Sequence, residues 1–537
     1  MGRRRGLVLG LCLLALPAPL AAQGDAVARS HLSYDIEVTL DPEQHTLTGR
    51  QRIHFENVSR APLPQLVFHL YLNAFRDRRS VFAREGGARL RGRAPGRPGS
   101  IMVTRLTTAA GQDLAQPLAL EPELVRGDFT QLRVRLPEPL PPSAAIDLVL
   151  EWRAELPQLV ARAGYAGEFH MLGQWFPKLA KLAPDGSFVS FPYHGFGEFY
   201  ADFADYQLTL EVPERFAIAS SGVRLEERVQ NGRRVERYAA RRVHDVAWAA
   251  YPYFEARTEQ VGATTVRLYA PRGYGAALAR QARVLTAALP YFEARYGAYP
   301  YPALTVIIPP REGYAASGME YPTLFTSEGP WWALPSWLPD PRHEVVSIHE
   351  LAHQWFSGLI ANNEVAHPVL DEGLTQWACL DFLRDYYGRP QFLSARLPFG
   401  PFDVLRAAFA ARSSTVPSSL LPADRYNART LASAVYARPA VVLEQLADRR
   451  GRPQLTAALS RYARAQRFRH PAPSDLWNAF ETSLGPGWGR VLRRALEGES
   501  PGALQVQTER DNHAPSGFSF LPELWTLASA LLRGVGP

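Results

Sequence analysis

The fold and the chemistry of this chain are decided by residues 345–356, which read VVSIHELAHQWF. Their apolar residues follow a helical pattern, so we expect a helix here. A helix turns by about 100° per residue, so the imidazoles of His349 and His353 project from one face and can chelate a single metal ion. Glu350 lies beside them. The alternative is a pair of exposed helix histidines with Glu350 in a surface ion pair.

A metal site with two histidines needs a third protein ligand, and a catalytic site leaves its fourth position to water. The sequence offers Glu372, which follows His353 by 19 residues. That interval is long enough to leave one helix, turn, and bring a carboxylate back from the next. Asp371 and Glu372 alone are typical of an acidic pair at a helix N-terminus. Together with the histidine pair, they predict a zinc site of His349, His353 and Glu372.

The N-terminal half of the chain shows a different pattern, in which apolar and polar residues alternate. This alternation is typical of half-buried antiparallel strands. We therefore predict an all-β domain over residues 25–257, a sandwich or saddle, with a long surface loop over residues 84–100. The clearest alternating stretches are Tyr34 to Leu40, Leu132 to Leu136, Ile146 to Trp152 and Tyr206 to Val212.

From residue 258 the pattern becomes α+β and then helical, which predicts a second domain over residues 258–497. A short buried strand is expected at Thr305 to Ile308. Residues 498–537 are expected to form a tail docked on this domain. The expected helices are Gly275 to Leu289, Val345 to Phe356, Leu374 to Tyr387, Ala434 to Ala447 and Ser474 to Leu496.

Composition excludes several classes of protein. With 537 residues, 46% of them hydrophobic and 21% charged, the chain is typical of a globular protein of two to four domains. Its formal charge of +7 is small and scattered, so we expect no nucleic-acid partner.

The first 22 residues resemble a secretory signal peptide. Arg3 to Arg5 precede an apolar run from Leu7 to Leu16, and small residues predict a cleavage site after Ala22. We expect a secreted or periplasmic protein with no transmembrane span in the mature chain. The alternative is an uncleaved anchor. Cleavage would leave Cys379 as the only cysteine, so no intrachain disulfide is expected.

A third motif lies about thirty residues before His349, where residues 317–321 read SGMEY. This motif, the H-E-x-x-H motif and Glu372, which follows His353 by 19 residues, together resemble those of the gluzincin aminopeptidases of the aminopeptidase N family. The exopeptidase motif of that family has the form Gly-x-Met-Glu-Asn. Ser317 and Tyr321 depart from that form, while the Gly318-Met319-Glu320 core is intact.

The resemblance implies a role for each of these residues. Glu320 would face the α-amine of a substrate, and an extended peptide would add along the edge that begins at Gly318 and Met319. Glu350 would act as general base beside a zinc-activated water. Tyr436, in the sequence VYARP, would stabilise the oxyanion, although Arg438-Pro439 departs from the family's Lys-Gly. Gln174 would help to hold the substrate's amino end.

The expectation is therefore an N-terminal antiparallel β-sandwich or saddle domain, followed by a thermolysin-like α+β zinc peptidase domain that ends in helices. The resemblance implies one Zn²⁺ per chain and peptide substrates with a free N-terminus. It also implies a short form without the large helical C-terminal domain of many relatives. Two alternatives stay open: a zinc hydrolase or endopeptidase with other substrates, and a secreted binding or scaffold protein without turnover. The sequence leaves the oligomeric state unknown.

Overall fold

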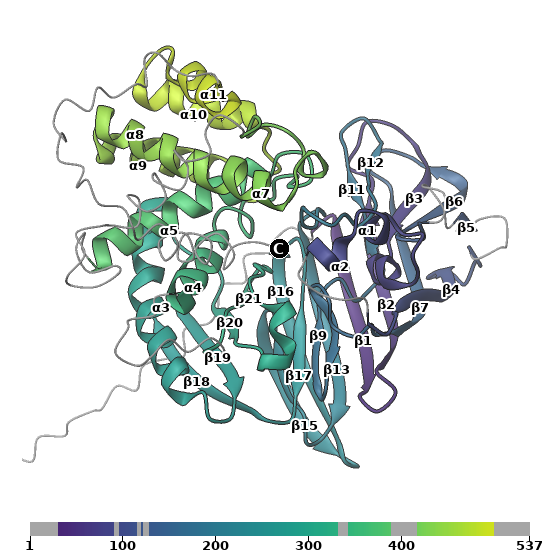
Figure 1. The fold of residues 1–537 in the computed structure, drawn as a ribbon. Helices are drawn as coiled ribbons and strands as arrows, with labels where there is room; N and C mark the ends of the chain where they lie inside the picture. The colour runs from purple at the N-terminus through teal and green to yellow at the C-terminus, as the bar shows by residue number, and fades with distance from the viewer. Residues whose placement is uncertain are drawn as a thin grey trace, which may run out of the picture.

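The computed structural model describes residues 30–90, 96–114, 120–121, 128–330, 342–387 and 416–498. Sheets form the N-terminal part, and helices dominate the C-terminal part, which lies beside them (Figure 1). This arrangement confirms the predicted fold class. The predicted signal segment and most of the predicted C-terminal tail lie outside the described residues.

The largest element is a seven-stranded sheet in the N-terminal part. Strand β1 shows the predicted alternation, because Tyr34, Ile36 and Val38 are buried while Asp35 and Glu37 are exposed on the opposite face. In sheet order, its strands are β15 (Val223–Gln230), β16 (Arg233–Val243), β13 (Ala204–Pro213), β1 (Leu32–Asp41), β2 (Thr46–Glu56), β7 (Ala145–Glu155) and β4 (Ser100–Thr108). The pairing differs from the prediction at one place, since β1 runs parallel to β13.

Smaller sheets complete the N-terminal part. One four-stranded sheet has the order β10 (Lys178–Leu179), β3 (Leu63–His69), β6 (Gln131–Leu140) and β5 (Leu120–Glu121), and β11 (Lys181–Leu182) pairs with β12 (Phe188–Val189). A second four-stranded sheet has the order β14 (Ala217–Ser220), β17 (Trp248–Tyr251), β9 (Phe169–Leu172) and β8 (Ala163–Ala166). Short helices η1 (Tyr71–Phe75), α1 (Val81–Arg84) and α2 (Gly87–Leu90) lie between the strands in sequence, α2 within the segment predicted as a loop.

The C-terminal part begins with a mixed sheet of β18 (Phe254–Val261), β19 (Thr264–Pro271), β20 (Ala303–Ile307) and β21 (Leu324–Thr326). Its strands β19, β20 and β21 run parallel to one another. The principal helices are α3 (Gly275–Tyr296), α4 (Arg342–His353), α5 (Glu372–Tyr387), α8 (Arg438–Arg450), α9 (Arg452–Ala465), α10 (Pro473–Leu484) and α11 (Trp488–Glu497). Shorter helices are η2 (Arg311–Ala316), η3 (Pro368–Leu370), η5 (Ala423–Arg425), α7 (Ala428–Leu431) and the π-helical turn η6 (Ala432–Ala437).

The helices differ from the sequence prediction in three ways. Helix α3 continues past Pro290 to Tyr296. The segment predicted as one helix to Leu496 is two helices, because Gly485 and Gly487 take positive φ values of 103° and 91° between α10 and α11. Helix α9 was not predicted.

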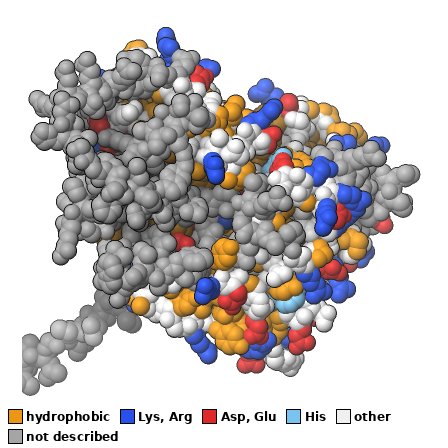
Figure 2. Space-filling view, viewed as in Figure 1, with side chains coloured by type: hydrophobic (Ala, Val, Ile, Leu, Met, Phe, Trp, Pro, Cys, Tyr) orange, Lys and Arg blue, Asp and Glu red, His pale blue; other side chains and the backbone are white. Residues whose placement is uncertain are grey.

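One hydrophobic core runs through both parts of the molecule. It includes Trp152 and Trp248 of the N-terminal sheets, Trp355 just after α4 and Trp377 on α5. Cys379 is buried in the same core and is a free thiol. Within the described residues, no helix combines the length and apolar character that a membrane span requires. On the face drawn in Figure 2, basic and acidic side chains are interspersed over the described surface.

Candidate active site

The two predicted histidines and the predicted carboxylate meet at the junction of two helices. His349 and His353 lie on α4, and Glu372 is the first residue of α5. His349 Nε2 is 3.0 Å from His353 Nε2 and 3.0 Å from Glu372 Oε2, and His353 Nε2 is 3.2 Å from the same oxygen. All three side chains are buried. The structure therefore brings together the three ligands inferred from spacing.

Local packing explains why these helices meet as they do. Ile348, Leu351 and Ala352 of α4 are buried in the core, and the histidines, about 100° further round the helix than Ile348 and Ala352, line the cavity. Helix α4 ends at His353, whose carbonyl accepts a hydrogen bond from the Gly358 amide. The chain then returns through η3, and Glu372 starts α5 where an acidic residue suits the helix dipole.

This donor set fits a zinc ion. Two imidazole nitrogens and one carboxylate oxygen converge within 4.8 Å of one another. Without a cation, buried nitrogen and oxygen lone pairs would face each other at contact distance, which is unfavourable in a low-dielectric site. Two histidines with one glutamate are a known ligand set of catalytic zinc, which leaves a position open for solvent.

Asp371 and Thr375 contact His353 at Nδ1, the ring nitrogen that does not face the other ligands. Asp371 Oδ1 lies 2.7 Å from His353 Nδ1, and Thr375 Oγ1 lies 3.1 Å from the same nitrogen. A carboxylate on the distal ring nitrogen fixes the orientation of a metal-binding imidazole and raises its basicity. The two acidic residues at the start of α5 thus have different roles. Glu372 faces the metal position, and Asp371 fixes the orientation of the His353 imidazole.

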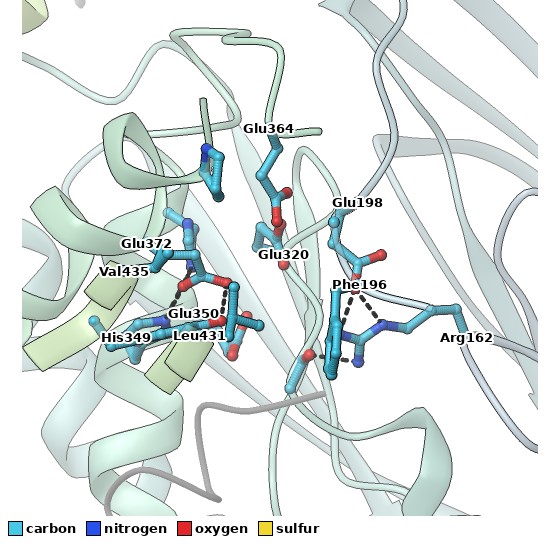
Figure 3. Close-up of a pocket in the computed structure, with 15 residues that line it drawn as sticks. Arg162, Phe196, Glu198, Glu320, His349, Glu350, Glu364, Glu372, Leu431 and Val435 are labelled. Carbon is cyan, nitrogen blue, oxygen red and sulfur yellow. Dashed lines mark hydrogen bonds and ion pairs between the residues drawn. The ribbon is translucent and has the colours of Figure 1, made fainter. Parts of the chain in front are cut away.

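Glu350 lies in the cavity next to this cluster, as Figure 3 shows. The cavity has a volume of about 480 Å³, including its opening to solvent, and Glu320, Glu350 and Tyr436 line it together with the three ligand residues. Glu350 Oε2 is buried without a hydrogen-bond partner. Burial, supported by the charge of Glu320, raises the pKa of Glu350 well above its usual range. A carboxyl with raised pKa and an unused oxygen is suited to accept a proton.

The segment that carries Glu320 is shaped by a glycine. Gly318 has φ +67°, a conformation that favours glycine, and its amide donates to the Thr326 carbonyl at 3.0 Å. Met319 in turn bridges to Thr326 in the sheet. The Glu320 side chain is 5% exposed and lines the cavity, and burial raises its pKa to about 8. The structure thus presents a buried carboxylate where the sequence predicted an amine-binding group.

Two residues from the N-terminal part complete the site, and sequence reasoning missed both. Arg162 donates through Nε and Nη2 to Glu198 at 3.0 and 2.7 Å, and through Nη1 to the carbonyls of Ser317 and Gly318 at 3.0 and 2.6 Å. Arg162 and Glu198 both line the cavity, on the side opposite the ligand helices in Figure 3. They lie in irregular segments without a periodic or motif signal, so sequence alone gave no means to find them.

Tyr436 reaches the cluster from the π-helical turn η6. Its hydroxyl donates to Glu372 Oε1, and its ring lies over that of His349. Burial and the charge of Glu372 raise the Tyr436 pKa well above its usual range, so the hydroxyl keeps its proton. A π-helical turn of this kind is common at functional sites because it changes which side chains face the cavity.

Gln174 lies elsewhere. Its amide donates to the buried Asp245, and Gln174 is not among the residues that line the cavity with Glu320.

Comparison with known proteins agrees with this geometry. Residues 277–494 match the model of the peptidase family M1 domain. Aminopeptidase M1-A of Oryza sativa subsp. japonica is 25% identical over 301 residues, which are 52% of this chain and 33% of that protein. Aminopeptidase 2 of Candida albicans is 24% identical over 242 residues, 42% of this chain and 25% of that protein. This chain therefore spans about a third or less of the length of these two relatives.

Solved structures show the same fold. An M1 zinc metallopeptidase from Deinococcus radiodurans superposes with a TM-score of 0.60 at 21% identity, covering 87% of this chain and 95% of that one. A complex of an M1 zinc metallopeptidase from the same organism with a Tyr-Ser-Ala substrate has a TM-score of 0.59 at 21% identity, with coverage of 87% and 94%. These findings confirm the resemblance to the aminopeptidase N family.

Proposed function

Because the chain carries a peptidase family M1 domain, we propose that it is a zinc-dependent aminopeptidase that hydrolyses the N-terminal peptide bond of peptides. One observation carries the proposal. The cavity that holds His349, His353 and Glu372 also holds Glu350 and, facing them, the buried carboxylate of Glu320. A metal centre, a general base and an amine-binding group thus line one site.

His349, His353 and Glu372 would hold the zinc ion, which polarises a carbonyl and lowers the pKa of a bound water toward about 7. Glu350 accepts the proton of the attacking water and passes it to the leaving amine. The Tyr436 hydroxyl, which donates to Glu372 in this structure, turns to donate to the developing oxyanion.

Glu320 selects for a free N-terminus. The α-ammonium of a substrate compensates the buried carboxylate, whereas an acetylated or internal residue leaves it without a partner and carries a cost. The Deinococcus radiodurans neighbour has been solved with a Tyr-Ser-Ala substrate, and related structures hold L-arginine and L-tryptophan, all of which bear a free α-amine. These complexes support amine-bearing substrates for this chain as well.

The test compares an aminoacyl-arylamide with its N-acetylated form. We expect cleavage of the free form alone, loss of activity on chelation and recovery with zinc. Glu350→Gln, which keeps the size of the side chain, should abolish turnover while zinc content stays the same. Equal cleavage of both arylamides would refute the exopeptidase assignment, and full activity of Glu350→Gln would refute the mechanism.

We also propose that the protein is exported, on the basis of the signal-like segment before Ala22. N-terminal sequencing of the protein recovered from its native cells tests this. A mature N-terminus at Gln23 would support cleavage after Ala22, and an intact N-terminus on cytosolic protein would contradict export.

A further inference from the structure

A second cavity adjoins the one that holds the metal ligands. It has a volume of about 390 Å³, including its opening to solvent. Glu198, Glu320 and Glu364 line both cavities, so these three carboxylates form the wall that the cavities share. In Figure 3, Glu364 descends from the loop between the ligand helices, and its carboxylate points toward Glu320.

Most charges around the second cavity are already paired. Arg162 binds Glu198, and Lys178 Nζ lies 2.8 Å from Asp245 Oδ2. Asp371 is held by His353. His244, which also lines the cavity, is neutral because burial lowers its pKa to about 3.

Two carboxylates remain. Among the residues that the structure describes, neither Glu320 nor Glu364 forms an ion pair with a lysine or arginine. Glu364 is 6% exposed, and burial, together with the charges of Asp371, Glu320 and Glu198, raises its pKa well above the usual range. A substrate's single α-ammonium can pair with Glu320, and a second cation beside Glu364 would favour the ionised form of that carboxyl.

Asn362 gives a second, independent sign of a ligand. It lines the second cavity, its side chain is buried, and both its amide oxygen and its amide nitrogen lack hydrogen-bond partners. Buried polar groups without partners are rare in folded proteins and call for an explanation such as a ligand. An amide oxygen and a carboxylate that line the same cavity match the donors of an ammonium or guanidinium group.

We propose that the second cavity binds the basic side chain of the substrate's N-terminal residue, and that Glu364 with Asn362 gives the enzyme a preference for N-terminal lysine or arginine. The inference rests on the proposed aminopeptidase function and names its substrate class. The substrate then supplies two cations: the α-ammonium for Glu320 and the side-chain cation for Glu364.

The first test uses the wild-type protein and substrates matched in length. Arginyl-arylamide is compared with citrullyl-arylamide, and lysyl-arylamide with norleucyl-arylamide, so that each pair differs chiefly in side-chain charge. The charged member can form a buried ion pair with Glu364 that the neutral member cannot form, so kcat/KM should favour the charged member by about thirtyfold or more. A ratio near one would overturn the inference while leaving the aminopeptidase function intact.

The second test uses Glu364→Gln, with Glu312→Gln as the matched control, because Glu312 is exposed and outside both cavities. Glu364→Gln should bring the arginine-to-citrulline ratio close to one, whereas Glu312→Gln should keep the wild-type ratio. A ratio measured within one variant is independent of its folded fraction. An equal loss for both substrates would assign Glu364 to the α-ammonium and overturn the inference.

A third readout does not depend on turnover. Calorimetry with free L-arginine and L-citrulline should show the same preference in the wild-type protein and its loss in Glu364→Gln. If no arylamide is cleaved, the proposed function fails, and the binding ratio still decides whether the second cavity selects a cation. Equal binding of the two amino acids would overturn the inference.

Discussion

Arg162 ties the N-terminal sheets to the segment that carries Glu320, so replacing it should loosen the site and destabilise the protein. Its side chain is 9% exposed and forms two hydrogen bonds with Glu198 and two with the carbonyls of Ser317 and Gly318. Arg162→Met keeps much of the side-chain volume and removes all four hydrogen bonds. It also leaves Glu198 buried without its cation.

The magnitude follows from that uncompensated charge. Breaking a buried ion pair by removing one partner costs about 3–5 kcal/mol of unfolding free energy. Arg162→Met combined with Glu198→Gln removes both charges of the ion pair and loses the hydrogen bonds to the carbonyls, which corresponds to about 1–3 kcal/mol. We therefore expect the double variant to be more stable than the single variant.

Urea unfolding followed by tryptophan fluorescence measures the stability of the three proteins, and hydrogen exchange measures local opening. Amides in residues 313–326 should exchange faster in Arg162→Met than in the wild type, because the carbonyls of Ser317 and Gly318 lose their donor. A loss below about 1 kcal/mol for Arg162→Met would refute the role of the ion pair. A double variant that is no more stable than Arg162→Met would also refute the role of the ion pair.

Two further predictions concern the metal site, and a third concerns the buried carboxylate of Asp202. Removal of zinc by a chelator should lower the Tm and abolish activity, and zinc should restore both, because the converging ligands bind the metal only in the folded state. Tyr436→Phe should lower kcat by about 10²–10³-fold with a small change in KM, since the hydroxyl acts on charge that develops during the reaction; an unchanged kcat would exclude that role. Asp202→Asn should remove a pH-dependent part of the stability. Burial alone would raise the pKa of Asp202, but hydrogen bonds from His31 and His470 and the charge of Lys181 outweigh burial and hold this pKa below its usual range. The stabilisation is thus present above the unfolded pKa of about 4 and is lost as the pH falls, so the Tm difference between wild type and Asp202→Asn should shrink from pH 5 to pH 2.

The metal ligands could be predicted from sequence because their geometry is local. Two residues four apart share a helix face, and the interval to Glu372 allows one reversal of the chain. The alternating strands were predictable for the same reason, since a period of two decides which side chains are buried in β1 and β13. What these signals have in common is that the residues involved lie within one or two consecutive elements.

The rest of the site depends on contacts between distant segments. Arg162 and Glu198 meet the Gly318 segment across more than 100 residues of sequence, and no spacing rule connects them. Glu364 gave no signal because a carboxylate in a loop is ordinarily exposed. Gln174 was assigned from a short resemblance, but its buried neighbour Asp245 holds its amide instead.

The parallel pairing of β1 with β13 constrains how the molecule assembles. β1 occupies an interior position of the seven-stranded sheet, between β13 and β2, although it precedes every other strand of the described residues in sequence. One edge of β1 therefore has no partner strand until β13, which ends at residue 213, has been synthesised. Such long-range closure is slow and exposes an unpaired edge to other chains. For a chain synthesised from its N-terminus, the seven-stranded sheet is therefore completed late, and a holding chaperone would be most useful during that interval.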